Sequence, residues 1–180
     1  MEWQIRNAEL GDVSRVVELA TPDEAELMPY VLSKSVLTGY IDQFIVAVGE
    51  DGVGGAVHRV AGLGPGGPGS PCRHRFDRTN CFLYYVKQVP PDITARFFSR
   101  RGALALLGQV VCPGKGSFYA ILEYLKERYD ELWCWMSVVG PSFRSYQRYG
   151  FQFTEPSREL WNVYKCGYST FALGRWTREE

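Results

Sequence analysis

Histidine, net charge and long apolar segments are scarce in this sequence, and each scarcity excludes a class of protein. The only histidines are His58 and His74, and the stretch Cys72–His74 has no second ligand pair at metal-site spacing, so we expect no bound metal. The 20 Lys and Arg residues balance the 20 Asp and Glu residues, which argues against coating nucleic acid or an anionic membrane by bulk charge. No apolar run approaches the ~20 residues of a membrane helix, so we expect no membrane partner.

The 5 cysteines do not form a disulfide framework. An odd number without tight pairing indicates reduced thiols, and Cys112 and Cys134 lie in apolar segments where we expect buried, inert side chains. The N-terminal segment has an acidic second residue and no apolar core, unlike a signal peptide. These features predict a cytoplasmic protein.

The composition that remains is that of a folded core. Hydrophobic residues make up 46% and aromatic residues 14% of the 180 residues, which predicts a single domain over residues 1–180. Residues 62–71 hold five Gly and three Pro, so we expect a loop there, within an insertion-like, Gly/Pro-rich and basic region over 64–102. Residues 52–101 carry eight bases against two acids, which favours an anionic partner or phosphorylated cofactor, or simply solvated loop charges.

Hydrophobic periodicity predicts alternating strands and helices. In the first half we expect strands at Trp3–Arg6, Phe44–Val48, Val53–Leu63 and Cys81–Val89, and helices at Gly11–Ala20, Asp23–Tyr40 and Asp92–Arg100. In the second half we expect strands at Ala103–Cys112, Leu132–Val139, Gly150–Phe153, Trp161–Tyr164 and Thr170–Leu173. Leu132–Val139 is apolar on both faces, as in a central parallel strand. Helices are expected after a glycine turn at 113–117 and at Pro141, which suits a first helical turn.

The segment with the clearest chemistry is a strand followed by Pro113–Ser117 and an amphipathic helix. Glycines after a strand let the backbone approach a ligand closely, and the first amides of the next helix have no internal partner. Together with the helix dipole they form a site for phosphate oxygens. A nucleotide, a dinucleotide or coenzyme A could supply these oxygens. The segment matches neither GxxxxGK[ST] nor GxGxxG, and a tight connection alone would also explain it.

The chain around and beyond this turn resembles the core of the GNAT superfamily, the Gcn5-related N-acetyltransferases. The matching features are Gly114-Lys115-Gly116 with Ala120-Ile121-Leu122 downstream, and the signature Tyr146-Gln147-Arg148-Tyr149-Gly150-Phe151. The N-terminal segments IRNAELGDVSRVVELA and FIVAVGEDGVGGAVHRVAGL are similar to the first strand and helix and to the second and third strands of the family. The resemblance covers residues 1–63 and 103–153.

The resemblance implies an α/β (α+β) fold with a mixed, mostly antiparallel central sheet flanked by helices. It also implies acetyl-CoA as cofactor, held by Val110, Val111, Cys112, Gly114, Lys115, Gly116, Ser117 and Phe118. The family's loop pattern (Gln/Arg)-x-x-Gly-x-(Gly/Ala) falls on Pro113, Gly116 and Phe118, so only its middle glycine matches. Proline offers no amide, and phenylalanine stands where the family prefers a small residue.

The implied reaction is transfer of an acetyl or acyl group from acetyl-CoA to a primary amine by direct attack. Tyr146 stands where the family tyrosine protonates the leaving thiolate, a task suited to a phenol with a pKa near 10. His58 is the candidate general base, since a histidine near neutral pH can accept the proton of an attacking ammonium. Each residue could instead be structural, Tyr146 as a packing aromatic and His58 as a satisfied strand histidine.

The acceptor could be a small molecule or a protein amine, and a homodimer is left open. Two other functions stay open beside acyl transfer. One is a catalytically degenerate binding module, motivated by Pro113 and Phe118. The other is a GNAT-like enzyme that modifies a nucleobase or nucleic acid, with the basic region 64–102 as its contact.

Overall fold

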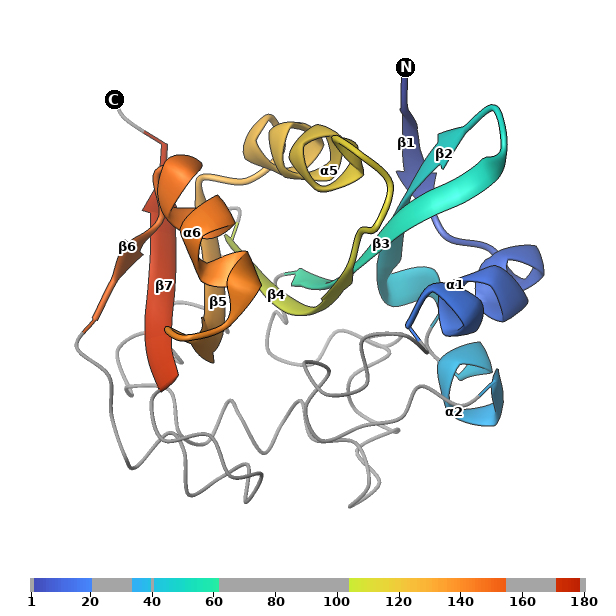
Figure 1. The fold of residues 1–180 in the computed structure, drawn as a ribbon, viewed down its shortest axis with the longest axis horizontal. Coiled ribbons are helices and arrows are strands. Elements are labelled where there is room, and N and C mark those ends of the chain that lie inside the picture. The colour runs from blue at the N-terminus through green and yellow to red at the C-terminus, as the bar shows by residue number, and fades with distance from the viewer. Residues whose placement is uncertain (1, 21–33, 40, 62–103, 155–170, 179–180) are drawn as a thin grey trace, which may run out of the picture. The chain divides into compact units, whose positions relative to one another are not determined.

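The computed structural model describes residues 2–20, 34–39, 41–61, 104–154 and 171–178 (Figure 1). The chain divides into two compact units, which are described separately: one contains Met1–Arg59 and Leu107–Arg128, the other Val60–Leu106 and Tyr129–Glu180. The expected loop at 62–71, the elements Cys81–Val89, Asp92–Arg100 and Trp161–Tyr164, and most of Asp23–Tyr40 lie outside the described residues.

The sheet of the first unit begins with an antiparallel meander. Its strands β1 (Gln4–Asn7), β2 (Phe44–Gly49) and β3 (Gly52–Ala61) are hydrogen-bonded in this order, and β4 (Leu104–Val111) follows β3; the outer ends of β3 and β4 extend into the second unit. Gly49 pairs with Gly52, whose φ of 94° places it in the left-handed region that suits glycine in a tight hairpin.

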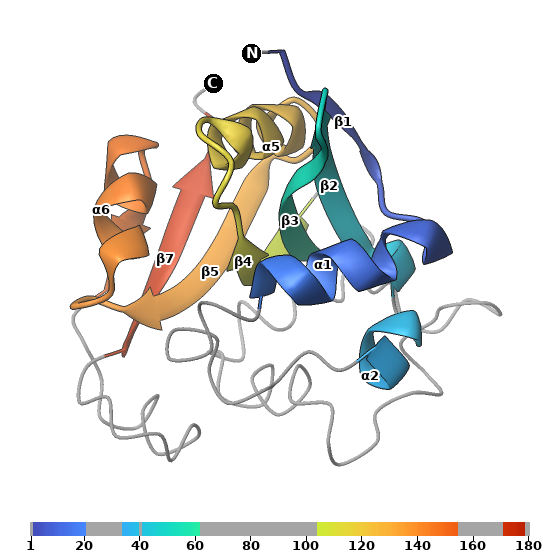
Figure 2. The same cartoon turned by 45° about the vertical axis from the view of Figure 1, so that its right-hand side comes forward.

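Helices cover both faces of this meander. The first unit contains η1 (Leu10–Asp12), α1 (Val13–Ala20), α2 (Lys34–Thr38), η3 (Ile41–Gln43) and α5 (Ser117–Lys126). Figure 2 shows α1 crossing one face of the strands, and its buried Val16 and Leu19 share a core with Phe44 and Val46 of β2. Side chains alternate between the two faces along a strand, so Ile45 and Ala47 of β2 point to the face opposite α1. The helix α5 contacts β1 and β2.

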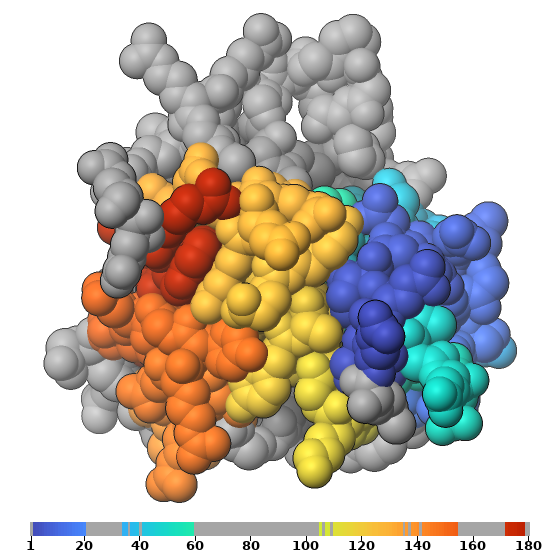
Figure 3. All heavy atoms as spheres, turned by 90° about the horizontal axis from the view of Figure 1, so that it is seen from above, coloured from blue at the N-terminus to red at the C-terminus, as the bar shows by residue number. Residues whose placement is uncertain are grey.

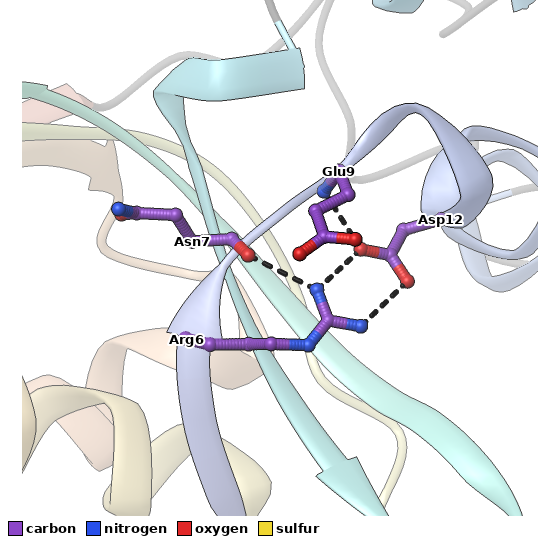
Figure 4. A network of polar contacts seen from close by, with 4 residues as sticks. All are labelled: Arg6, Asn7, Glu9 and Asp12. Atoms are coloured by element: carbon purple, nitrogen blue, oxygen red, sulfur yellow. Dashed lines mark hydrogen bonds and ion pairs between the residues drawn. The ribbon is translucent and has the colours of Figure 1, made fainter.

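A salt bridge fixes the exit of β1 into η1. The Arg6 guanidinium donates to both carboxylate oxygens of Asp12, with distances of 2.6 and 2.9 Å (Figure 4). The same carboxylate accepts the Glu9 amide at 2.8 Å, as the third residue of a capping box does. The Arg6 guanidinium beside it holds the pKa of Asp12 below its usual value, more strongly than partial burial raises it.

The second unit is built on β5 (Glu131–Ser137), β7 (Phe171–Thr177) and β6 (Gln152–Phe153), with α6 (Pro141–Arg148) between β5 and β6 along the chain. β7 lies between the other two strands and is antiparallel to both. Gly174 in β7 leaves the space that the Phe153 ring and the Cys134 sulfur occupy, because a Cβ there would lie less than 3.0 Å from each.

The architecture is a mixed, mostly antiparallel sheet flanked by helices, as the sequence predicts. The buried residues of β5 on both faces show that both faces of Leu132–Val139 are covered, as the sequence predicts. β5 pairs with β7 antiparallel, and the parallel pairing expected for this strand stays a prediction, since β7 is only one of its two neighbours. One expectation needs correction: the last strand is longer than Thr170–Leu173, since it runs to Thr177. Among the described helices, none has the length and apolar character needed to cross a membrane.

Candidate active site

A tight turn joins β4 to α5 and has a defined shape. The Ser117 amide donates to the Gly114 carbonyl at 2.9 Å, which closes a four-residue turn around Lys115 and Gly116. Gly116 has φ 84° and ψ −6°, the values of the third residue of a type II turn. Glycine is the residue that adopts this conformation at least cost, which explains why it stands here.

The turn is attached to β3 through one carbonyl. The Gly54 oxygen accepts the Gly114 amide at 2.9 Å and lies 3.3 Å from the Ser117 hydroxyl, which also donates to Gly114 at 2.7 Å. Ser117 is fully buried, and both its amide and its hydroxyl donate hydrogen bonds to the Gly114 carbonyl inside the turn. In this structure Ser117 therefore holds the shape of the turn. Hydrogen bonds to a cofactor would come from the neighbouring residues of the turn.

Two amides of the turn remain available to a ligand. Among the described residues, the amides of Lys115 and Gly116 donate to no backbone carbonyl, and both residues are exposed. They directly precede α5, whose N-terminus carries a partial positive charge. Pro113 adds no donor. The start of α5 reaches the surface on the same face as the N-terminal segment (Figure 3, yellow and dark blue). This arrangement suits an anion such as a pyrophosphate.

The other expected cofactor residues flank this turn. The Val111 side chain belongs to the core, whereas Val110, Cys112 and Phe118 are partly buried. The Cys112 thiol lies 3.8 Å from the Ala56 carbonyl, and burial raises its pKa to about 12. The Cys134 thiol is buried, as expected, and its pKa is also raised, so in both residues the reactive thiolate form is disfavoured. No group of metal-ligating side chains occurs among the described residues.

His58 lies in the first unit on β3, but in a closed environment. It is 7% exposed, its Nε2 lies 3.0 Å from the Gln43 side-chain oxygen, and its ring stacks on Phe44 at 4.9 Å. Gly108 of β4 makes room for it, since a Cβ there would lie 2.7 Å from Nδ1. Burial, helped by the Arg59 charge, lowers the pKa of His58 to about 4. A group of that pKa is a weak base toward an ammonium ion, so its role as general base stays a prediction and its contacts are those of a structural histidine.

Tyr146 lies in the second unit, in the last turn of α6. The Phe151 amide donates to the Tyr146 carbonyl at 3.1 Å, and the Gly150 amide donates to Gln147 at 3.0 Å. With Gly150 at φ 82°, these two bonds define a Schellman motif. The Tyr146 ring meets Phe151 edge-on at 4.9 Å and is 1% exposed. The Tyr-x-x-x-Gly-Phe signature therefore describes a Schellman motif that ends α6, together with the hydrophobic contact between Tyr146 and Phe151. The Tyr146 hydroxyl takes part in neither the two hydrogen bonds nor the ring contact of this motif.

The structure thus brings Cys112, Gly114 and Ser117 together around residues 54–56 of β3. It also adds two residues that the sequence reasoning missed, Trp3 and Gly54. The indole nitrogen of Trp3 donates to the Lys115 carbonyl at 3.2 Å, 112 positions along the chain. No local pattern signals a contact over such a separation.

No protein-family model matches the chain, and no curated protein matches it. Solved structures do. A phosphinothricin acetyltransferase of the GNAT superfamily from Sinorhizobium meliloti, in complex with AcCoA, is similar with a TM-score of 0.58 and 15% identity over 98% of this chain and 89% of that one. A polyamine N-acetyltransferase of Drosophila melanogaster is similar with a TM-score of 0.59 and 12% identity, and the match covers 98% of this chain and 100% of that one.

An N-acetylglutamate synthase from Neisseria gonorrhoeae, complexed with coenzyme A and N-acetyl-glutamate, gives a TM-score of 0.56 and 13% identity. The match covers 99% of this chain and 36% of that one, so this chain spans about a third of the synthase's length. At these identities the likeness establishes the fold. This chain has the fold of the GNAT superfamily.

Proposed function

We propose that the protein is an acyl-CoA-dependent N-acyltransferase, with acetyl-CoA as donor and a primary amine as acceptor. The observation that carries this proposal is the type II turn at the start of α5, with the Lys115 and Gly116 amides available for the coenzyme A pyrophosphate. The GNAT fold supports it, because two similar structures, an N-acetylglutamate synthase and a phosphinothricin acetyltransferase, were solved with coenzyme A and AcCoA bound.

In the proposed reaction the amine nitrogen attacks the thioester carbonyl, and the C–S bond breaks as the tetrahedral intermediate collapses. Coenzyme A leaves as a thiolate that takes a proton from the Tyr146 hydroxyl, and the amine loses its proton to solvent or to a base. The chain's contribution is to bind the phosphates through backbone amides, to hold the turn through Ser117 and Gly54, and to supply the proton from Tyr146.

The competing function is a GNAT-like module that binds a partner without catalysis. It is favoured by Pro113, which removes a donor from the turn, and by Ser117, whose donors are used internally. The basic region 64–102, the motive for a nucleic-acid substrate, lies outside the described residues.

Two glycine substitutions test the proposed binding site as a matched pair. Gly116 and Gly52 both have positive φ, 84° and 94°, and a Cβ would meet only Trp3 Nε1 at 3.7 Å in the first case and nothing within 4 Å in the second. Gly116→Ala and Gly52→Ala should therefore cost similar stability, about 1–2 kcal/mol. Only Gly116→Ala should weaken binding of acetyl-CoA, measured by calorimetry, because only its methyl group stands in the turn 114–117 that is proposed to bind the phosphates.

The wild-type protein should also gain about 2.7 kcal/mol of stability at a ligand concentration of about 100 Kd. A panel of amines with thiol detection then separates the two functions, since a binding module releases no free coenzyme A. Absence of any binding at millimolar acetyl-CoA would contradict the acyltransferase proposal.

A further inference from the structure

The Trp3 indole packs against glycines from two parts of the first unit. A Cβ on Gly49, Gly54 or Gly114 would lie less than 3.0 Å from its six-membered ring, so only glycine at these positions leaves the ring its space. Gly49 and Gly54 belong to the β2–β3 hairpin, whereas Gly114 belongs to the turn before α5. The ring therefore packs against both the β2–β3 hairpin and the turn 114–117.

The indole N–H also holds one particular peptide group. It donates to the Lys115 carbonyl, which shares a trans peptide plane with the Gly116 amide. In a trans peptide the C=O and N–H point in opposite directions. With the carbonyl turned toward the indole, the Gly116 N–H is aimed away from it.

This peptide has an alternative orientation. Type I and type II turns share the closing hydrogen bond and differ by a rotation of the central peptide by roughly 180°. Glycine at the third position accepts either form, because it tolerates both signs of φ. The bond from Ser117 to Gly114 would survive the rotation, and the bond from Trp3 to Lys115 would not. In this turn, the Trp3 hydrogen bond is the contact that favours the type II form.

We propose that Trp3 is a positioning residue: its indole N–H sets the Lys115–Gly116 peptide so that the Gly116 amide faces the phosphates of the bound coenzyme. The inference rests on the proposed function for the identity of the ligand. The orientation of the peptide is a property of the chain alone, so the two parts can fail separately.

The test uses Trp3→Phe, which removes the N–H and keeps an aromatic ring on the glycines. Its matched control is Trp133→Phe in the second unit, which also removes an indole hydrogen bond, the 3.0 Å bond to Glu131. The sequence contains a single Lys-Gly dipeptide, at 115–116. Labelling lysine carbonyls with ¹³C and glycine nitrogens with ¹⁵N therefore isolates the signal of this one peptide by NMR.

We expect the Gly116 signal of free Trp3→Phe to differ from wild type by far more than that of Trp133→Phe. The Kd for coenzyme A should rise about tenfold, the scale of one lost hydrogen bond to a charged group. The Kd of Trp133→Phe should stay at the wild-type value.

Two outcomes overturn the inference: an unchanged Gly116 signal in free Trp3→Phe, or an altered signal with a wild-type Kd. If coenzyme A moves no signal even in the wild type, the proposed function is wrong. The spectra without ligand then still decide whether Trp3 orients the peptide.

Discussion

Tyr146 packs through its backbone and its ring, and the proposed function assigns the chemistry to a different atom, its hydroxyl oxygen. Its backbone carbonyl and its ring complete the Schellman motif with Phe151, and neither contact uses the hydroxyl. A phenylalanine would form the same motif. The signature Tyr-x-x-x-Gly-Phe therefore explains the helix end through the backbone and the two rings, and the role of the hydroxyl is a separate question that substitution can test.

We predict that Tyr146→Phe separates these two roles. The free energy of unfolding, measured in urea, should change by no more than about 1 kcal/mol, because only a hydroxyl is removed. The turnover of acetyl-CoA should fall roughly 10²-fold, the usual scale for a positioned acid. The Michaelis constant for acetyl-CoA should move less, since the proton is needed only as the thiolate leaves.

Tyr149→Phe is the control for this prediction. Tyr149 caps the same helix through its backbone and is three residues away, so its substitution should leave the rate nearly unchanged. Full activity in Tyr146→Phe would return Tyr146 to the core. Equal losses in both variants would point to the helix end and exclude a specific role of the Tyr146 hydroxyl.

At the scale of elements, periodicity predicted best where packing is local. The amphipathic helix expected after the glycine turn is α5, and its Ile121, Leu122 and Leu125 are fully buried. Pro141 begins α6 and Gly150 follows its end, as their conformational preferences require. For β5 the burial of both faces was predicted correctly, whereas a parallel neighbour stays a prediction, because an apolar strand records its burial and not the direction of the strand with which it pairs.

The candidate site was predictable only in its local part. The turn and Gly116 follow from a glycine-rich connection between strand and helix. The Gly54 carbonyl and the Trp3 indole come from segments more than fifty positions away along the chain. The contact of the indole depends on glycines at 49, 54 and 114, which leave space for its ring. Such a fit is a property of the tertiary structure, and no spacing rule within one segment expresses it.

The link between β1 and η1 gives a prediction at this scale. Asp12→Asn keeps the shape of the side chain but loses the charge that Arg6 contacts, so we expect a loss of about 1–3 kcal/mol at pH 7. Because the folded pKa of Asp12 is lowered, its contribution is complete above the unfolded value near 3.9 and is lost as pH falls through the folded pKa. Urea unfolding at pH 7 and pH 3 measures both.

The wild type and Asp12→Asn should therefore differ at pH 7 and converge in acid. Glu18→Gln is the control, since its ion pair with Arg15 is formed between exposed side chains and should contribute little. A difference between wild type and Asp12→Asn that does not depend on pH would mean that the hydrogen-bond geometry, and not the charge, stabilises this link.

At the scale of the whole molecule, pH acts through the groups that folding perturbs. The chain has no net charge at pH 7, so general charge repulsion contributes little near neutrality. Among the described residues, His58 is a perturbed group whose unfolded pKa lies just below neutrality. It is buried against Phe44 and Gln43, and its folded pKa of about 4 lies below the unfolded value of 6.5.

We predict that His58 dominates the loss of stability between pH 7 and pH 5. In this range the unfolded chain binds a proton at His58 and the folded protein does not, so the free energy of unfolding falls as pH falls. The expected loss is about 2 kcal/mol by pH 5, at about 1.36 kcal/mol per pH unit below 6.5. His58→Gln should abolish this slope, and His74→Gln, which retains His58, should keep it. A slope that survives in His58→Gln would mean that His58 is not buried in its neutral form, and would restore it as a base able to accept a proton near neutral pH.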